Sequence, residues 1–350
     1  MEFSTINKST DYFVANLHTG TGSSQAITTG LNMSANGGMV WNKTRNSVNN
    51  HVLWDTIRGV QETIYPDLTA VEATEATSLT AFTTTGWTGG GAGNTNGSTI
   101  TNVSWNWLAN GAGSSNTDGD ITSTVSVNTT AGFSIVKYTG NGSNAQTVGH
   151  GLGSVPKMII VKPIDYDDHW SVYHSTMGNT KFLYLDGSDS VFTGASRWSD
   201  TSPTSSLFTI GTSSPATGGG YTYDYIAYCF SEISGYSKME SYTGNGVVDG
   251  TFVYTGFRPA CVLIKCTSQT ESWVIYDNKR EGYNPQNDYL RPDTNGVESN
   301  STTDIDLLSN GFKIRSAGAG HNNDVGKNYI YMAFAEAPFV NSEGIPDNAR

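Results

Sequence analysis

An internal repeat is the feature that most constrains what this chain can fold into. A glycine turn occurs three times, as HTGTG at residues 18–22 and as YTGNG at residues 138–142 and 242–246. After 21, 20 and 19 further residues, each turn is followed by the lysine that ends an apolar strand. These lysines are Lys43, Lys162 and Lys265. They lie 119 and 103 residues apart, which is the length of a domain and not of a solenoid repeat.

Two further landmarks follow each lysine in the same order. The first is an aromatic strand with a polar turn, at residues 51–59, 169–178 and 272–282. The second is another aromatic strand, which closes each copy. The sequence therefore predicts three tandem copies of one domain. The predicted boundaries are residues 1–110 for the first copy, 111–131 for a Gly/Ser/Thr-rich linker with ITSTVSV as an extended strand, 132–235 for the second copy, and 236–350 for the third copy with a C-terminal tail.

Composition and strand pattern both predict an all-β fold. Only 14% of the residues are charged, against about 25% in ordinary domains, and Gly is abundant at 40 residues. Gly, Thr, Ser and Asn favour turns and strands over helices. Bulky side chains alternate on both faces of the aromatic strands, as in strands that pack on two sides. We expect three β-sandwiches of jelly-roll or lectin-like type, with residues 69–82 as a segment that could be helical in part.

Charge and hydropathy exclude several classes of partner. The net charge is −12 and no run of Lys or Arg occurs, so we expect no nucleic-acid partner. No apolar run of about 18 residues is present, so we expect no membrane insertion. The three cysteines, Cys229, Cys261 and Cys266, are interpreted as small core residues. No cofactor motif is found.

Several segments give a resemblance to a known family. They include GHGLGSVPKMIIVK, SWVIYDNKREGYNP and, as the most specific, FAEAPFVNSEGIPDNAR. In these segments, and over nearly the whole chain from about Tyr12 to Arg350, the sequence resembles virion structural proteins of marine and freshwater tailed bacteriophages, cyanophages included. Proteins of this kind are often described as tail fibre or structural proteins. The resemblance implies a location on the virion surface and brings no catalytic residues. Many tail fibres have a long anchor or shaft that this sequence lacks, which leaves a compact decoration role open.

A pair of opposite charges occupies the same place in the first and third copies. The pairs are Asp55 with Arg58 and Asp277 with Arg280, where the second copy has His174 and Met177. We favour a turn in which Asp accepts backbone N–H groups and Arg clamps the loop, over a ligand-binding or interface pair. Loss of the pair from the second copy suggests a role that the fold can do without. For the three strand-end lysines we expect solvated ammonium groups above apolar stems.

Two other groups of residues are weak candidates for binding. One consists of acidic turns that could hold a metal ion but lack the spacing of a known calcium loop. The other consists of aromatic residues in loops that could stack on sugar rings or lie in an interface. These candidates are Asp165, Asp167, Asp168, Asp118 and Asp120 for metal, and Trp87, Trp198 and Tyr283 for glycan.

The sequence as a whole predicts a non-enzymatic surface protein of a tailed bacteriophage virion, acting as a fibre or adhesin module in host attachment. One alternative is a capsid or tail decoration or connector protein, and another is a glycan-degrading enzyme with two carboxylates in a cleft. The expected partners are other virion proteins, with host surface glycan as a second possibility. A homo-oligomer is expected from the bulky faces of the closing strands, and a homotrimer from analogy with fibres.

Overall fold

Nearly all regular structure in the chain is β. The computed structural model describes residues 4–211, 216–338 and 340. The helical elements in these residues have three or four residues each: η1 (Ser9–Asp11), α1 (Met33–Asn36) and α2 (Gly93–Asn96). The predicted all-β class is therefore confirmed. Within the described residues no helix has the length and apolar character needed to cross a membrane.

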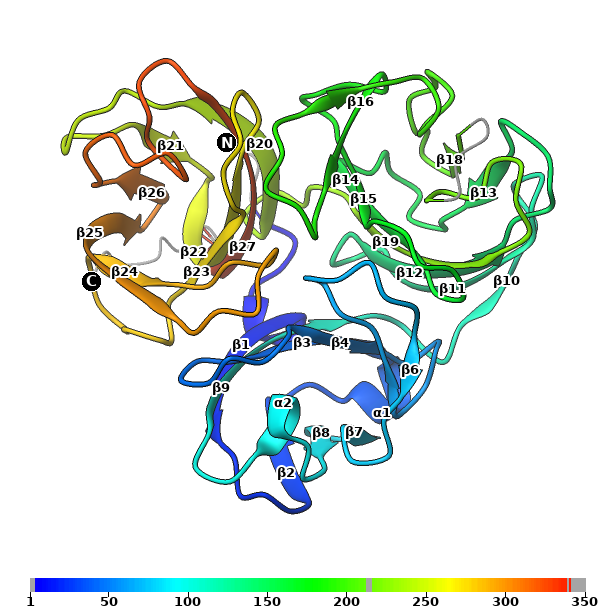
Figure 1. Ribbon diagram of the computed structural model, residues 1–350, viewed down its shortest axis with the longest axis horizontal. Coiled ribbons are helices and arrows are strands. Elements are labelled where there is room, and N and C mark those ends of the chain that lie inside the picture. Colours follow the sequence, from blue (N-terminus) through cyan, green and yellow to red (C-terminus); the bar gives the residue numbers. More distant parts are fainter. Residues whose placement is uncertain (1–3, 212–215, 339, 341–350) are drawn as a thin grey trace.

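Three antiparallel sheets surround a common centre, one in each of three lobes (Figure 1); two have four strands, and the third has eight, of which the four central ones correspond to the others. We call them the inner sheets of the first lobe (residues 4–110), the second lobe (111–235) and the third lobe (236–340). The strand order is equivalent in all three: β1-β9-β3-β4, β12-β19-β14-β15 and β20-β27-β22-β23. Their bounds are β1 (Phe13–Thr19), β9 (Thr101–Leu108), β3 (Gly38–Thr44), β4 (Val52–Asp55), β12 (Phe133–Thr139), β19 (Asp224–Phe230), β14 (Met158–Pro163), β15 (Ser171–His174), β20 (Ser237–Thr243), β27 (Asn328–Pro338), β22 (Phe257–Cys266) and β23 (Val274–Asp277).

A second sheet covers the outer face of each inner sheet, so that every lobe has two layers. The orders are β2-β8-β7, β13-β18 and β21-β26-β25-β24. Apolar side chains fill the space between the layers, such as Trp54 with Trp87 in the first lobe and Tyr138 with Phe208 in the second. The bounds are β2 (Gln25–Thr28), β8 (Gly86–Gly89), β7 (Leu79–Thr83), β13 (Thr147–Gly149), β18 (Leu207–Thr209), β21 (Phe252–Tyr254), β26 (Gly311–Ile314), β25 (Ser299–Leu308) and β24 (Gln286–Tyr289).

The remaining strands correct two expectations. Residues 111–131 were expected to be a linker with an extended strand at 121–127; that strand is present, and it pairs with a second strand and with β12, so that the segment extends the second inner sheet and does not merely link lobes. Residues 69–82 contain strands and no helix, since their many Thr residues favour extended backbone. The strands are β10 (Ser114–Asn116), β11 (Ser123–Asn128), β16 (Lys181–Tyr184), β17 (Phe192–Thr193), β5 (Glu62–Thr63) and β6 (Ala73–Thr74), the last two paired with each other.

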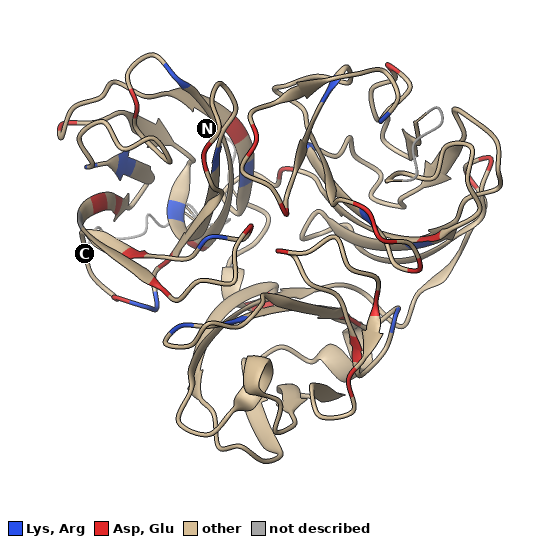
Figure 2. Ribbon diagram, in the orientation of Figure 1, with Lys and Arg blue, Asp and Glu red and all other residues tan. Residues whose placement is uncertain are grey.

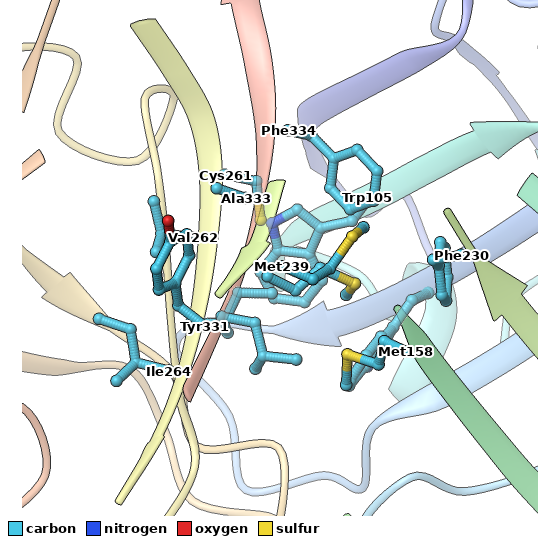
Figure 3. Close-up of a cluster of buried hydrophobic side chains, with 14 of the residues drawn as sticks. Trp105, Met158, Phe230, Met239, Cys261, Val262, Ile264, Tyr331, Ala333 and Phe334 are labelled. Carbon is cyan, nitrogen blue, oxygen red and sulfur yellow. The ribbon is translucent and has the colours of Figure 1, made fainter. Parts of the chain in front are cut away.

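The three lobes share one apolar core at their meeting point. Trp107, Phe230 and Phe334 occupy the same register position on the closing strands β9, β19 and β27. Their ring centroids form a triangle with sides of 6.3, 5.5 and 5.9 Å. Figure 3 shows residues of all three lobes in this region: Trp105 of the first, Phe230 of the second and Phe334 of the third.

This core explains the bulky residues on both faces of the closing strands. In β27 the side chains of Ile330, Met332 and Phe334 are buried in the shared centre, and those of Tyr329 and Tyr331 are buried as well. Both faces are thus covered within one chain. The sequence argument for packing between subunits is corrected accordingly, and only the analogy with fibres still favours a homotrimer.

Candidate functional site

The two Asp–Arg pairs form identical buried turns. Asp55 Oδ1 accepts a hydrogen bond from the backbone N–H of Arg58 at 2.9 Å, and its Oδ2 accepts one from Arg58 Nε at 2.6 Å. Asp277 and Arg280 repeat the arrangement at 3.0 and 2.7 Å. All four side chains are excluded from solvent. The geometry is that of the clamped turn favoured from the sequence, and the burial excludes direct contact with a glycan.

Each of these carboxylates also receives a hydrogen bond from a neighbouring lobe. Tyr228, on the second lobe, donates its hydroxyl to Asp55 Oδ2 on the first at 2.7 Å. Trp105, at the register position equivalent to Tyr228, donates its indole N–H to Asp277 Oδ2 on the third lobe at 3.2 Å. The Asp residues therefore join lobes as well as closing turns.

The second lobe replaces this contact and does not lose it. The third-lobe residue equivalent to Trp105 and Tyr228 is Met332, which has no polar hydrogen to donate. Facing it, His174 occupies the place of the Asp and donates Nε2–H to the carbonyl of Tyr331 at 3.3 Å. Burial lowers the pKa of His174 to about 4, so the ring is neutral at pH 7 and holds one proton for this bond. The second lobe thus does without the Asp–Arg pair and keeps a contact between lobes at this place.

The three strand-end lysines are buried and also bridge lobes, which corrects the expectation of solvated ammonium groups. Lys162 Nζ donates to the carbonyl of Thr69 on the first lobe at 2.8 Å. Lys265 reaches Ser188 of the second lobe at 2.8 Å, and Lys43 reaches Asn295 of the third lobe at 3.4 Å. Burial, partly offset by nearby carboxylates, lowers the pKa of each lysine to about 8.

A third set of contacts follows the same cyclic order. Trp170 Nε1 donates to the carbonyl of Tyr65 at 2.9 Å, and Trp273 Nε1 donates to that of Tyr184 at 2.8 Å. In the first lobe the equivalent residue is His51, whose Nε2 bonds the carbonyl of Arg291 at 3.0 Å. The recurring polar residues of the repeat thus have structural partners across the lobe boundaries. Figure 2 shows acidic residues on loops that run toward the centre and the basic residues scattered over the three lobes.

Two of the three aromatic candidates for glycan binding are buried. Trp87 lies in the first-lobe core with no exposed surface, and Trp198 is 2% exposed. Both were wrong as exposed stacking residues, because Trp87 lies on β8 and packs between the layers of the first lobe, and Trp198 packs into the core of the second. Tyr283 is 69% exposed. It stays a candidate.

The acidic candidates for metal binding lie in separate turns. Asp120 Oδ2 accepts from the amide and hydroxyl of Thr147, and these hydrogen bonds lower its pKa. Asp118 accepts from the side chain of Asn116. Asp165 accepts the amide of Asp224, Asp168 accepts that of His169, and Asp167 is exposed in the same loop. Among the described residues no group of three His, Cys, Asp or Glu side chains is placed to hold a metal ion.

The structure adds a feature that the sequence interpretation missed: three tyrosines stacked in a row on the second lobe. Tyr166 and Tyr223 stack at 4.3 Å between ring centroids with 12° between planes. Tyr223 and Tyr221 continue the row at 5.6 Å and 16°. Tyr166 is 38% exposed, and the other two are half-buried. We call Tyr166, Tyr221 and Tyr223 the tyrosine row.

Rigid backbone contacts position this row. Gly140 and Gly142, in the YTGNG turn, donate their amides to the carbonyls of Tyr223 and Tyr221 at 2.9 and 3.0 Å. An added Cβ at Gly140 would lie 2.2 Å from the Tyr221 carbonyl oxygen, so this close approach requires glycine. The alternation in YTYDY, residues 221–225, was a signal in the sequence that Tyr221 and Tyr223 lie on one face of the chain. The distant Tyr166 could be added only by the fold.

Cavities near the surface offer little acid–base chemistry. One of about 330 Å³ lies where the second and third lobes join, and Glu232 is the carboxylate among its described lining residues. Another of about 390 Å³ lies between the same two lobes and has Lys181 but no carboxylate in its lining. Neither cavity presents the paired carboxylates that glycoside hydrolysis requires.

Comparison with known proteins gives one match. A family model described as a domain of unknown function (DUF7483) matches residues 8–338, nearly the whole chain. No curated protein and no solved structure matches the sequence or the fold.

Proposed function

The chain belongs to the DUF7483 family, a domain of unknown function, and we propose that it is a non-enzymatic surface protein of a tailed bacteriophage virion. In this role it serves as a compact fibre or adhesin module that contacts the host. The resemblance of segments such as GHGLGSVPKMIIVK to phage virion proteins suggests the location. The three lobes are proposed to be tandem copies of one β-sandwich domain.

One observation carries the non-enzymatic part of the proposal. The polar residues that recur in the repeat are committed to contacts between lobes: Asp55 with Tyr228, Asp277 with Trp105, and the three lysines with backbone carbonyls. A catalytic Lys or Asp must reach a substrate, and these side chains are buried among their partners. Their arrangement supports a scaffold that holds three lobes in a fixed orientation.

A rigid body of this kind suits adhesion at a virus surface. Loops at the ends of sandwiches can present contacts without moving, so that little conformational entropy is lost on binding. Many copies on a particle multiply weak contacts into strong attachment. The expected partners remain other virion proteins and a host surface glycan.

The proposal is tested on intact particles of the virus that encodes the chain. Gold-labelled antibody against the purified protein should mark the particle surface, and the purified protein should be retained on host cells without shortening their polysaccharide. Labelling restricted to disrupted particles would contradict the surface location. Release of new reducing ends from the polysaccharide would overturn the non-enzymatic assignment.

A further inference from the structure

We propose that strand β21 of the third lobe is a docking surface for a second copy of this chain, which pairs with it antiparallel about a two-fold axis through Val253. The proposal goes beyond the virion role proposed above and does not depend on it. Four observations carry it: the unpaired backbone of β21, its exposed aromatic side chains, the state of the equivalent strands in the other lobes, and the charge along the strand.

The backbone of β21 is paired on one side only. This strand ends the outer sheet of the third lobe, on the side away from the first lobe (Figure 1), and it pairs with β26 alone. The amide of Thr255 donates to the carbonyl of Asn310, next to β26. Because bonding residues alternate along an antiparallel strand, Val253 also bonds β26, and the N–H and C=O groups of Phe252 and Tyr254 point the other way. We call this side of β21 the free edge.

The two residues with these backbone groups carry exposed aromatic side chains. Phe252 is 44% exposed and Tyr254 is 57% exposed, whereas Val253 between them is buried in the lobe. Within the part of the chain that the structure describes, neither ring stacks on another. Edge strands usually carry charges or irregularities that prevent pairing, as β24 does at the other end of this sheet with Asp288 and a shift in register. The free edge of β21 has neither.

The equivalent strands of the other lobes show that the fold does not require aromatic residues here. In the second lobe the chain itself covers the edge of β13: the amide of Ile121 donates to the carbonyl of Thr147 at 3.1 Å, and the amide of Thr147 donates to Asp120 at 3.0 Å. In the first lobe, β2 has the smaller Ala26 and Thr28 at the places of the two aromatic residues. Where this edge is covered, the cover is thus an extended segment of polypeptide.

A second copy of β21 is an extended segment that matches the free edge. With Val253 of both copies on the two-fold axis, Phe252 of each copy lies opposite Tyr254 of the other. These two residues then exchange N–H···O=C hydrogen bonds, and their side chains form cross-strand aromatic pairs, which stabilise sheets. The same surface of each copy meets itself, as in other two-fold interfaces, and the two outer sheets become one continuous sheet.

Charge along the strand does not oppose this pairing. From residue 249 to residue 257 the one side chain that is charged at pH 7 is Asp249, and it forms an ion pair with Lys313 of its own lobe. About an axis through Val253, the Asp249 residues of the two copies lie at opposite ends of the paired strands. No like charges therefore face each other across the interface.

The size of the exposed surface sets the strength of the association. From their exposed fractions, Phe252 and Tyr254 together offer roughly 200 Å² per copy, since an aromatic side chain can bury about 150–250 Å². This area is typical of small, reversible interfaces and is too small for a permanent dimer. We therefore expect monomers at about 1 μM chain and a dimer population that grows up to about 100 μM.

The test is sedimentation velocity of the full chain over this range of concentration, with charges introduced at the free edge. Phe252→Lys and Tyr254→Glu each remove both cross-strand aromatic pairs and should raise the dissociation constant of the dimer at least about tenfold. The double variant Phe252→Lys with Tyr254→Glu places opposite charges across the axis and should associate more tightly than either single variant. Ala26→Lys with Thr28→Glu makes the same changes at the equivalent places of the first lobe, and it should dimerise as the unchanged protein does.

Several outcomes would overturn the proposal. They are a chain that stays monomeric at about 100 μM, a trimer in place of a dimer, unchanged dimerisation of both single variants, or an equal loss in the first-lobe control. A double variant that associates no better than the single ones would contradict the pairing about Val253. Thermal unfolding of each variant controls for folding, and the exposed positions should leave its midpoint unchanged. Antibody labelling of particles tests the virion role separately, so either proposal can fail without the other.

Discussion

The hydroxyl of Tyr228 on the second lobe donates a 2.7 Å hydrogen bond to Oδ2 of Asp55 on the first, in a region from which solvent is excluded. The same carboxylate holds the Arg58 turn. One acidic side chain thus closes its own lobe and joins it to the next. Contacts of this type recur around the centre, and the following predictions test what they contribute.

Removing the donor at this contact should destabilise the whole chain. Tyr228→Phe keeps the ring in place but leaves Asp55 Oδ2 without one partner, and we expect a loss of about 1–3 kcal/mol in the free energy of unfolding. Urea unfolding measures the change. Tyr254→Phe is the matched control, because Tyr254 is 57% exposed. An equal effect of both substitutions would refute a role for the cross-lobe bond.

Arg58→Met should be more damaging, because it leaves the buried Asp55 without its cation and removes a partner from Glu72. The expected loss is about 3–5 kcal/mol. The double variant Asp55→His with Arg58→Met imitates the second lobe, which has His174 and Met177 at these places. We expect it to be at least about 1 kcal/mol more stable than Arg58→Met alone. A double variant that is less stable than the single one would show that the two kinds of boundary are not interchangeable.

Stability should depend on the protonation of the buried lysines. In the folded chain Lys162 has a pKa of about 8, against 10.5 when unperturbed, so between these values the unfolded state binds more protons. The free energy of unfolding therefore rises with pH through this window. Relative to Lys162→Met, the unchanged protein should gain about 2 kcal/mol between pH 8 and pH 10.

Urea unfolding at each pH measures that difference, in which the titration of other groups cancels. The same pH series on Lys8→Met serves as control, since the Lys8 side chain is 69% exposed. The difference in the free energy of unfolding between Lys162→Met and the unchanged protein could also stay constant from pH 8 to pH 10. That result would mean that Lys162 does not titrate in this window.

The shared core predicts that the lobes unfold together. Trp107, Phe230 and Phe334 lie in one continuous apolar cluster that includes residues of all three lobes. We expect a single calorimetric transition whose van't Hoff and calorimetric enthalpies agree. Phe230→Ala should lower the midpoint of that one transition, with a loss of about 3–5 kcal/mol. Two or three separated transitions would instead indicate lobes that are stable alone.

Local sequence was sufficient for the class of the fold and for the recurring elements. Short β-branched and aromatic runs between glycine turns specify strands, because their side chains alternate and their turns need positive φ, as at Gly22, Gly142 and Gly246. The clamped turns at Asp55 and Asp277 were also within reach, since Asp and Arg three residues apart can close a turn by themselves.

The tertiary structure alone decided which faces meet. Whether a strand-end lysine is solvated or buried depends on carbonyls about 80–250 residues away, as Lys162 with Thr69 and Lys43 with Asn295 demonstrate. Packing of the two layers within a lobe buried Trp87 and Trp198, and packing around the centre paired His174 with a carbonyl of another lobe. It also brought Tyr166 beside Tyr223, from loops far apart in the chain. Periodicity fixes which side chains share a face of a strand, but long-range packing selects the surface that covers that face.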